Sequence, residues 1–250
     1  MDTMPALDSE LIRQAKVELA AICRWAARLG LQSGIDNHFS LAVPGRPDLM
    51  LINPEGYFWS EVTAGSLVLA THDGTILSAN GNTVEITAFC IHAPIHRLRP
   101  QAAAVLHTHM PHATAICSRP GGTVSPSYLS AMALYRRIAY DRDFSGLALS
   151  PAEGERLAAL LGDNVVLMMD NHGPLVVGSS AGEALLRLMY LEESCRIQLL
   201  AESGGARQQQ IPDHILEGDP DDVARYREYS NTFMRAIIRR LTKEEPDFLS

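Results

Sequence analysis

Residues 103–109 read Ala103-Ala-Val-Leu-His107-Thr-His109, and this stretch decides the expected fold and site. Its apolar, partly β-branched first half is typical of a short buried strand. Because residues i and i+2 of a strand point to the same face, the imidazoles of His107 and His109 are expected to converge on one spot. Two converging imidazoles are half of a divalent-metal site. Since so short a spacing also occurs often by chance, two unrelated histidines at a strand end are the alternative interpretation.

A third histidine follows a second apolar segment. The run Val165-Val-Leu-Met-Met169 leads directly into Asp170-Asn171-His172-Gly173. Two strands that end in histidines, instead of continuing into the core, indicate one site built at their tips. The sequence therefore predicts a metal site whose ligands are His107, His109 and His172.

The composition is that of a globular protein and argues against one class of partner. The chain has 250 residues, of which 46% are hydrophobic and 6% aromatic, without a low-complexity tract. We therefore expect one large domain rather than two small ones. The 29 acidic and 21 basic residues give a formal charge of −8, and Lys and Arg form no cluster of five or more. This charge pattern argues against nucleic acid as a partner.

Neither membrane insertion nor disulfide bonding is expected. No stretch approaches 18 uncharged apolar residues, and the first ten residues contain neither a basic region nor an apolar run. We therefore expect a soluble, cytoplasmic protein without a membrane partner. The four cysteines lack C-x-x-C spacing and are expected to be reduced core thiols; they are Cys23, Cys90, Cys117 and Cys195.

Helix and strand patterns alternate along the chain without a strict βαβ rhythm or a glycine-rich dinucleotide loop. This mixture predicts an α/β layer structure around a mixed or antiparallel sheet. Helices are expected at 11–29, 85–97, 151–161, 181–203 and 221–241. Strands are expected at 38–43, 49–52, 66–70, 75–77, 103–109, 165–169 and 175–177, with a hairpin at Asp73-Gly74.

The last fifth of the chain is expected to stand apart from the rest. A glycine- and glutamine-rich break at 204–210 separates the final helix from the preceding one. We therefore divide the chain into a domain at 1–203 and a linker with a C-terminal helix at 204–250. The final helix is expected to pack on a neighbouring subunit rather than on its own core.

Several motifs in order resemble the class II aldolase and adducin head superfamily. They include Asp36-Asn37-His38 before a strand, Arg99-Pro100 eight residues ahead of the His-x-His, and a later His172-Gly173. The resemblance covers about residues 9–203. It implies a three-layer α/β/α fold with a central, mainly antiparallel sheet. It also implies a homotetramer with active sites between subunits.

The resemblance also implies a chemistry that agrees with the histidines. In aldolases of this superfamily, the imidazoles matching His107, His109 and His172 hold a divalent cation, most commonly zinc. Manganese or iron suits the same ligands. Such a cation acts as a Lewis acid that polarises a carbonyl so that a neighbouring carbon–carbon bond can break.

The general acid or base is expected at Glu85. The superfamily places a glutamate before Arg-Pro, and ungapped counting from Arg99 puts that position at Ala88, with Glu85 three residues earlier. Because one helical turn separates the two positions, Glu85 can reach the same pocket as a ligand or proton shuttle. The alternative is an acid that only stabilises the first turn of its helix.

A phosphorylated substrate is disfavoured. Where sugar-phosphate aldolases have Gly-Asn and hydroxyl-rich loops, this chain has Asp36-Asn37, Pro54-Glu55-Gly56 and Thr83-Val84-Glu85. Carboxylates in such a pocket repel a phosphate dianion. The chain therefore resembles the non-sugar branch, which includes decarboxylases of hydroxylated aromatic acids, and also adducin-like proteins.

Four further residues are candidates for substrate chemistry. Tyr128 lies 19 residues beyond His109, where aldolases of the superfamily carry a tyrosine that donates a proton across the subunit boundary. Asn37 and His38 are expected to contact substrate. Arg142, together with Arg136 and Arg137, is expected to hold a substrate carboxylate. For Tyr128, His38 and Arg142, a structural or solvent-exposed role is the alternative.

The expected function is a divalent-metal-dependent lyase. It would cleave a carbon–carbon bond of a small carboxylated substrate by retro-aldol reaction or decarboxylation. The alternatives are a non-catalytic, adducin-head-like interaction module and an iron-dependent oxygenase on the same fold. A binding module has no physical need for three converging imidazoles, which favours the enzyme.

Overall fold

One mixed sheet forms the centre of the protein. The computed structural model describes residues 9–205, 208–217 and 222–250. In these residues seven strands pair in the order β3-β2-β1-β4-β7-β6-β5, and only β5 and β6 are parallel. The strands are β1 (His38–Val43), β2 (Arg46–Ile52), β3 (Val68–Thr71), β4 (Ala104–His107), β5 (Ile138–Asp141), β6 (Val166–Met169) and β7 (Gly173–Gly178).

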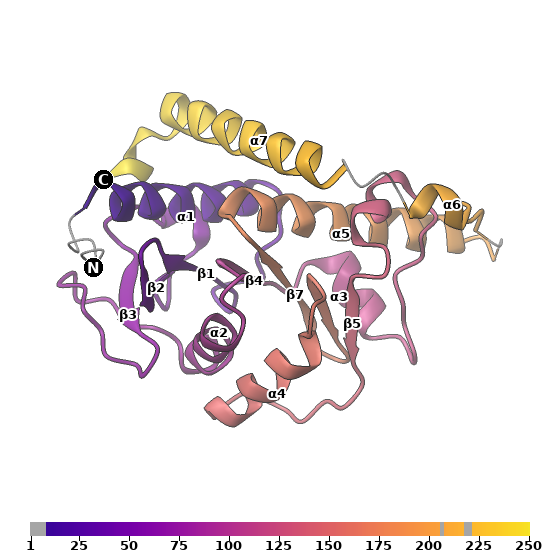
Figure 1. The fold of residues 1–250 in the computed structure, drawn as a ribbon, viewed down its shortest axis with the longest axis horizontal. Coiled ribbons are helices and arrows are strands. Elements are labelled where there is room, and N and C mark those ends of the chain that lie inside the picture. Colours follow the sequence, from indigo (N-terminus) through magenta and orange to yellow (C-terminus); the bar gives the residue numbers. More distant parts are fainter. Residues whose placement is uncertain (1–8, 206–207, 218–221) are drawn as a thin grey trace.

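Helices cover both faces of this sheet (Figure 1). Helices α1 (Glu10–Arg28) and α5 (Ala181–Glu202) lie on one face, and α2 (Ile86–Leu98) and α4 (Pro151–Leu161) lie on the other. The short helix α3 (Pro111–Cys117) packs against β7 and α5. The predicted three-layer α/β/α architecture with a mainly antiparallel sheet is therefore confirmed.

The alternation of β1 separates an apolar layer from a polar one. Phe39 points toward the α1 side and packs on Trp59, with 4.1 Å between ring centroids. His38 and Ser40 point to the opposite face, where both bond to His92 of α2. Strand β4 lies between β1 and β7 at the centre of the sheet, and β4 and β7 are buried along their whole length. The histidine end of β4 is therefore held rigidly from both sides.

The C-terminal helix α7 (Asp222–Glu244) packs on its own chain, against α1 and α5. Its side chains Met234, Ile237 and Leu241 belong to the main hydrophobic core. This corrects the expectation that the final helix leaves its own core. The apolar stripe of the helix finds a matching surface on α1 and α5. An additional contact between its outer face and a neighbouring subunit stays a prediction.

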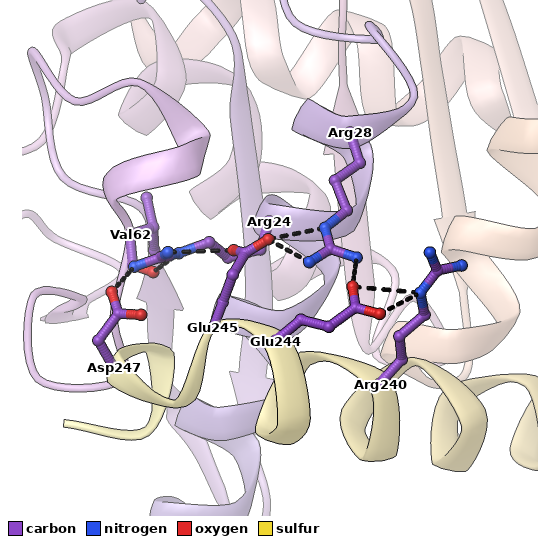
Figure 2. A network of polar contacts seen from close by, with 7 residues as sticks. All are labelled: Arg24, Arg28, Val62, Arg240, Glu244, Glu245 and Asp247. Atoms are coloured by element: carbon purple, nitrogen blue, oxygen red, sulfur yellow. Dashed lines mark hydrogen bonds and ion pairs between the residues drawn. The ribbon is translucent and has the colours of Figure 1, made fainter.

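A polar network fastens the end of the chain to α1 (Figure 2). The buried Arg24 guanidinium donates to the carboxylates of Glu245, at 3.1 Å, and Asp247, at 2.6 Å. Arg28 pairs with Glu244 and Glu245. Because each of the three nitrogens of the buried guanidinium donates to a carboxylate or carbonyl oxygen, the network offsets the cost of burying charge.

Most predicted elements form, and a few differ. The stretch at 75–77 is not a strand; it contributes only one isolated bridge, between Ala70 and Ile76. Helix α3 and strand β5 were not expected, because each is too short to show a clear period. The four cysteines are free and buried, as predicted. Among the described residues, no helix combines the length and apolar character needed to cross a membrane.

Candidate metal centre

Three histidines converge at the tips of β4 and of the β6–β7 turn. One ring nitrogen from each of His107, His109 and His172 lies within 4.8 Å of the others. The Nε2 atoms of His107 and His109 are 3.2 Å apart, and the His172 ring centroid is 4.6 Å from that of His107. The structure thus brings together the three ligands that the sequence predicted.

The backbone fixes which nitrogen His107 offers. Its Nδ1 lies 3.0 Å from the carbonyl oxygen of Pro174, the second residue of β7. Since a carbonyl can only accept, Nδ1 carries the proton and Nε2 of the neutral ring keeps a free lone pair. A hydrogen bond of this kind orients many metal-binding imidazoles.

The turn that carries His172 depends on the conformation of the two residues on either side of it, Asn171 and Gly173. Met169 pairs with Gly173 across the β6–β7 hairpin, and Asn171 adopts a left-handed conformation with φ of 57°. Asparagine tolerates that conformation better than most residues. A Cβ at Gly173 would lie 2.7 Å from the carbonyl oxygen of Thr108 and 3.2 Å from Cδ2 of His109. The motif Asn-His-Gly is therefore what allows the hairpin to close against the His-x-His segment.

Electrostatics keep the three imidazoles neutral. Burial, and then the neighbouring imidazoles, lower the pKa of His107 well below its ordinary value. The same causes lower the pKa of His172 to about 4, and burial lowers that of His109. Neutral imidazoles are the form that binds a cation. Three nitrogen donors with converging lone pairs suit zinc, manganese or iron and leave coordination positions for substrate oxygens.

A small cavity next to the triad is lined by other predicted residues. Asn37, His38, Glu55, Glu85 and Ala88 share this cavity. The Oδ1 atom of Asn37 accepts a hydrogen bond from the Ser33 amide at 2.7 Å, but its Nδ2 is buried without a partner. Because an unpaired buried donor is costly, this amide is a natural contact for a bound acceptor.

Glu85 occupies the N-cap of α2. Its carboxylate accepts a hydrogen bond from the Ala88 amide at 2.9 Å and another from the Thr87 hydroxyl. The alternative role, stabilisation of the first helical turn, is therefore present. Glu85 also lines the cavity together with Ala88, as the one-turn spacing predicted. Its role as ligand or proton shuttle stays a prediction.

Among the described residues, neither Tyr128 nor Arg142 forms a hydrogen bond to a triad histidine of its own chain. Tyr128 precedes the 3-10 helix Leu129–Leu134 and lies near Tyr190 on α5. Its predicted action on a neighbouring subunit stays a prediction. Arg142 donates to Asp170 at 2.8 Å and to the Gly122 carbonyl at 2.9 Å.

The arginines near Arg142 do not gather around one spot. Arg136 pairs with Glu217, and the carboxylate of Asp141 is bound by Arg156. For Arg142 to hold a substrate carboxylate, the substrate would have to replace the protein acceptors that it now contacts. That role also stays a prediction.

His38, expected near the pocket, belongs to a second group of histidines whose hydrogen bonds to one another were not predicted. His38 Nδ1 lies 2.7 Å from His92 Nε2, and the Ser40 hydroxyl bridges His92 and His96 at 2.6 and 2.7 Å. The signal was present, because His92 and His96 are four residues apart on one helix and His38 and Ser40 are two apart on one strand. Only the packing of α2 on β1 makes the two patterns meet.

Comparison with known proteins agrees with this geometry. A family model described as the Class II Aldolase and Adducin N-terminal domain matches residues 17–199. The crystal structure of an aldolase II superfamily protein from Pseudomonas syringae superposes with a TM-score of 0.86 and 33% identity, over 97% of both chains.

Two relatives differ in what their names say. The decarboxylase NovR of Streptomyces niveus is 31% identical over 80% of this chain and 76% of its own. Alpha-adducin of Rattus norvegicus is 32% identical over 82% of this chain, but the match spans only 27% of that protein. The family model covers well over half of the chain, so the protein belongs to the class II aldolase and adducin N-terminal domain family.

Proposed function

We propose that this protein is a divalent-metal-dependent lyase that breaks a carbon–carbon bond of a small carboxylated substrate. The observation that carries the proposal is the convergence of His107, His109 and His172 within 4.8 Å. A bound cation would supply Lewis acidity toward a carbonyl oxygen. Zinc is the first candidate, and manganese and iron suit the same three nitrogens.

The cavity beside the triad favours a substrate without phosphate. Glu55 and Glu85 both line it, and repulsion between two unit charges 4 Å apart is about 4 kcal/mol near a protein surface. The two protein carboxylates therefore repel a phosphate dianion much more strongly than they repel a substrate that carries one carboxylate. The buried Nδ2 of Asn37 offers a neutral donor for a substrate oxygen. A hydroxy acid, keto acid or aromatic carboxylate matches this combination, because it carries less negative charge than a phosphate ester and offers an oxygen to the amide.

Loss of CO₂ and retro-aldol cleavage remain the two forms of the proposal. Ala88 lies where the superfamily's glutamate is expected by ungapped counting, and the nearest carboxylate, that of Glu85, is engaged as a helix cap. A decarboxylation does not need a base to remove a proton from carbon. The relation to the decarboxylase NovR supports this form.

Proton donation is assigned to a second subunit. Tyr128 forms no hydrogen bond to the triad of its own chain among the described residues, and it would act in a homotetramer whose sites lie between subunits. A phenol at such a site can protonate a developing carbanion or alkoxide. Glu85 is the second candidate for proton transfer, and His38 and Asn37 would contact the substrate.

A non-catalytic binding module is the competing function, because the relation to alpha-adducin includes it. The structure offers one argument against it. His107 is buried, and among the described residues its Nε2 meets only the ring of the partly buried His109. A purely structural site would be expected to pair such nitrogens.

Metal analysis and a substrate screen test the proposal. The purified protein is expected to bind one equivalent of zinc or manganese per chain. In a screen of hydroxy acids, keto acids and aromatic carboxylates it should release CO₂ or an aldehyde. Iron together with oxygen consumption would indicate an oxygenase instead. Absence of metal binding in protein supplied with each cation would overturn the proposal in favour of a binding module.

A further inference from the structure

A continuous hydrogen-bonded chain runs from a backbone carbonyl to the edge of the metal centre. It begins at the Ala102 carbonyl, which lies 3.0 Å from His96 Nδ1. It continues from His96 Nε2 through the Ser40 hydroxyl to His92 Nδ1, over 2.7 and 2.6 Å. It ends with the 2.7 Å contact between His92 Nε2 and His38 Nδ1. We call these four side chains, His38, Ser40, His92 and His96, the relay.

The carbonyl at the start of the relay sets the direction of its hydrogen bonds. Because the Ala102 oxygen can only accept, His96 Nδ1 carries the proton and His96 Nε2 is an acceptor. The Ser40 hydroxyl must then donate to His96, and its oxygen accepts from His92 Nδ1–H. His92 Nε2 is left as an acceptor. His38 Nδ1 therefore donates to His92, and the remaining nitrogen of His38, Nε2, has no proton.

This assignment requires neutral rings, and their environment keeps them neutral. The relay residues are buried, with exposed fractions between 0% and 5%. Burial, followed by neighbouring imidazoles, lowers the pKa of His92 well below the ordinary value and that of His96 to about 3, and His38 takes its proton position from its hydrogen bond to His92. Each neutral ring carries one proton, so the tautomer of each histidine follows from the one before it.

The bare nitrogen lies beside the candidate metal ligands. His38 pairs with His107 across β1 and β4, with 4.9 Å between ring centroids. Its Nδ1 points to His92, so Nε2 projects from the other side of the ring. His38 lines the cavity that Asn37 and Glu85 share, and it is outside the triad of converging ligand atoms. Its lone pair is therefore available to a molecule bound in that cavity.

We propose that His92, Ser40 and His96 are positioning residues that hold His38 in the tautomer whose Nε2 accepts a hydrogen bond from a substrate hydroxyl. The inference rests on the proposed function for the substrate, but the tautomer itself does not depend on it. The Asn37 amide would donate to a substrate oxygen, and His38 Nε2 would accept from a substrate hydroxyl. Together they would select an acid that carries a hydroxyl group. Ser40 transmits the direction set at the Ala102 carbonyl, because its hydroxyl has a single hydrogen to donate.

Nitrogen-15 NMR of the histidine-labelled, metal-free protein tests the tautomers directly. His38, His92 and His96 are each expected to carry their proton on Nδ1 in the wild type. Observation of an Nε2–H on His38 would overturn the proposal, whether or not the protein binds metal.

The Ser40→Ala variant tests control by the relay. Without the hydroxyl, the wild-type direction leaves a buried His92 N–H unpaired, which is costly. The reversed direction leaves only a lone pair unpaired, so His38 is expected to shift its proton to Nε2. His96→Gln is the matched control, because the Gln amide can donate to the Ala102 carbonyl and accept from Ser40. It should keep the proton of His38 on Nδ1; tautomers unaffected by Ser40→Ala would contradict the proposal.

Binding of two probes to the zinc-loaded protein tests the consequence for substrate. Glycolate carries a hydroxyl donor, and methoxyacetate replaces that donor with a methyl ether that can only accept. Wild type should prefer glycolate, and the preference should fall about fivefold in Ser40→Ala, the scale of one hydrogen bond. An unchanged preference would overturn the role of His38. Failure to load zinc would instead count against the proposed function, and the tautomers would still be read from the metal-free protein.

Discussion

Two groups of histidines lie on opposite sides of one contact, that between His38 and His107, and they are built differently. The relay is buried throughout, whereas in the triad only His107 is fully buried. In the relay, each ring nitrogen from His96 to His38 Nδ1 has a hydrogen-bond partner, a donor facing an acceptor at every step. The chain of bonds begins at the Ala102 carbonyl. In the triad, the hydrogen bond from His107 Nδ1 to the Pro174 carbonyl leaves the lone pair of His107 Nε2 facing His109. Among the described residues, no donor outside the triad bonds to that lone pair. A backbone carbonyl fixes the proton on Nδ1 in both groups, so the group that meets the opposite nitrogen decides whether an imidazole continues a hydrogen-bonded chain or faces a ligand.

Removal of a triad ring should have the largest effect. In His109→Ala the metal affinity is expected to fall by more than about 100-fold, beyond the loss typical of an outer-shell change, and activity should disappear. The fold and the relay should persist, because His109 is only partly buried and is not a relay member. Metal content after dialysis and thermal unfolding measure the two effects. His112→Ala, a nearby imidazole that pairs with Glu192, is the control, and its retention of metal is expected.

A change outside both groups should affect turnover alone. Tyr128→Phe is expected to lower turnover about 100-fold, the lower range for loss of a proton donor, with metal content unchanged. The measurement is CO₂ or aldehyde release with the substrate found by screening. If the metal is lost together with turnover, Tyr128 supports the triad and does not act as a proton donor.

Crowding the triad without removing a ligand should have a smaller effect. The Cβ in Gly173→Ala would press on the Thr108 carbonyl and on the His109 ring. We expect metal affinity to fall 10- to 100-fold and stability to fall by about 1–3 kcal/mol. Gly204→Ala is a suitable control, because a Cβ there meets no atom within 4 Å. Equal metal affinity in wild type and Gly173→Ala would show that the hairpin is looser than the structure indicates.

The relay should be visible in the pH dependence of stability. Burial and the nearby His72 imidazole lower the pKa of His96 from 6.5 to about 3. Between these values the unfolded chain binds a proton that the folded protein does not. Stability therefore falls as the pH decreases through this window, by up to about 1.4 kcal/mol per pH unit for this one group.

In His96→Gln this contribution is absent, so the free energy of unfolding of the metal-free protein should depend less steeply on pH. Denaturant unfolding from pH 8 to pH 4 measures the slopes. The difference between the two proteins at pH 8 gives the cost of the substitution itself. Parallel slopes would mean that His96 is protonated in the folded protein, which would also break the hydrogen-bond order of the relay.

Local patterns were enough to predict a large part of the fold. The first helix was expected at 11–29 and forms at Glu10–Arg28, and the long helix begins behind Ser180, whose hydroxyl accepts from the Glu183 amide. These signals act over a few residues, so they can be read from the chain directly. The short elements α3 and β5 gave no such signal, because packing on α5 and pairing with β6 stabilise them.

By itself, the sequence determined the ligand types, the i and i+2 spacing of His107 and His109, and the tight turn that places His172. Only the tertiary structure decided that α7 returns to its own core and that Glu85 is used as a cap. It also decided that two unrelated histidine patterns, one on β1 and one on α2, join into a relay. The physical reason is that side-chain direction within an element follows from backbone geometry. Contacts between elements depend instead on which surfaces bury one another, and no short stretch of sequence contains that information.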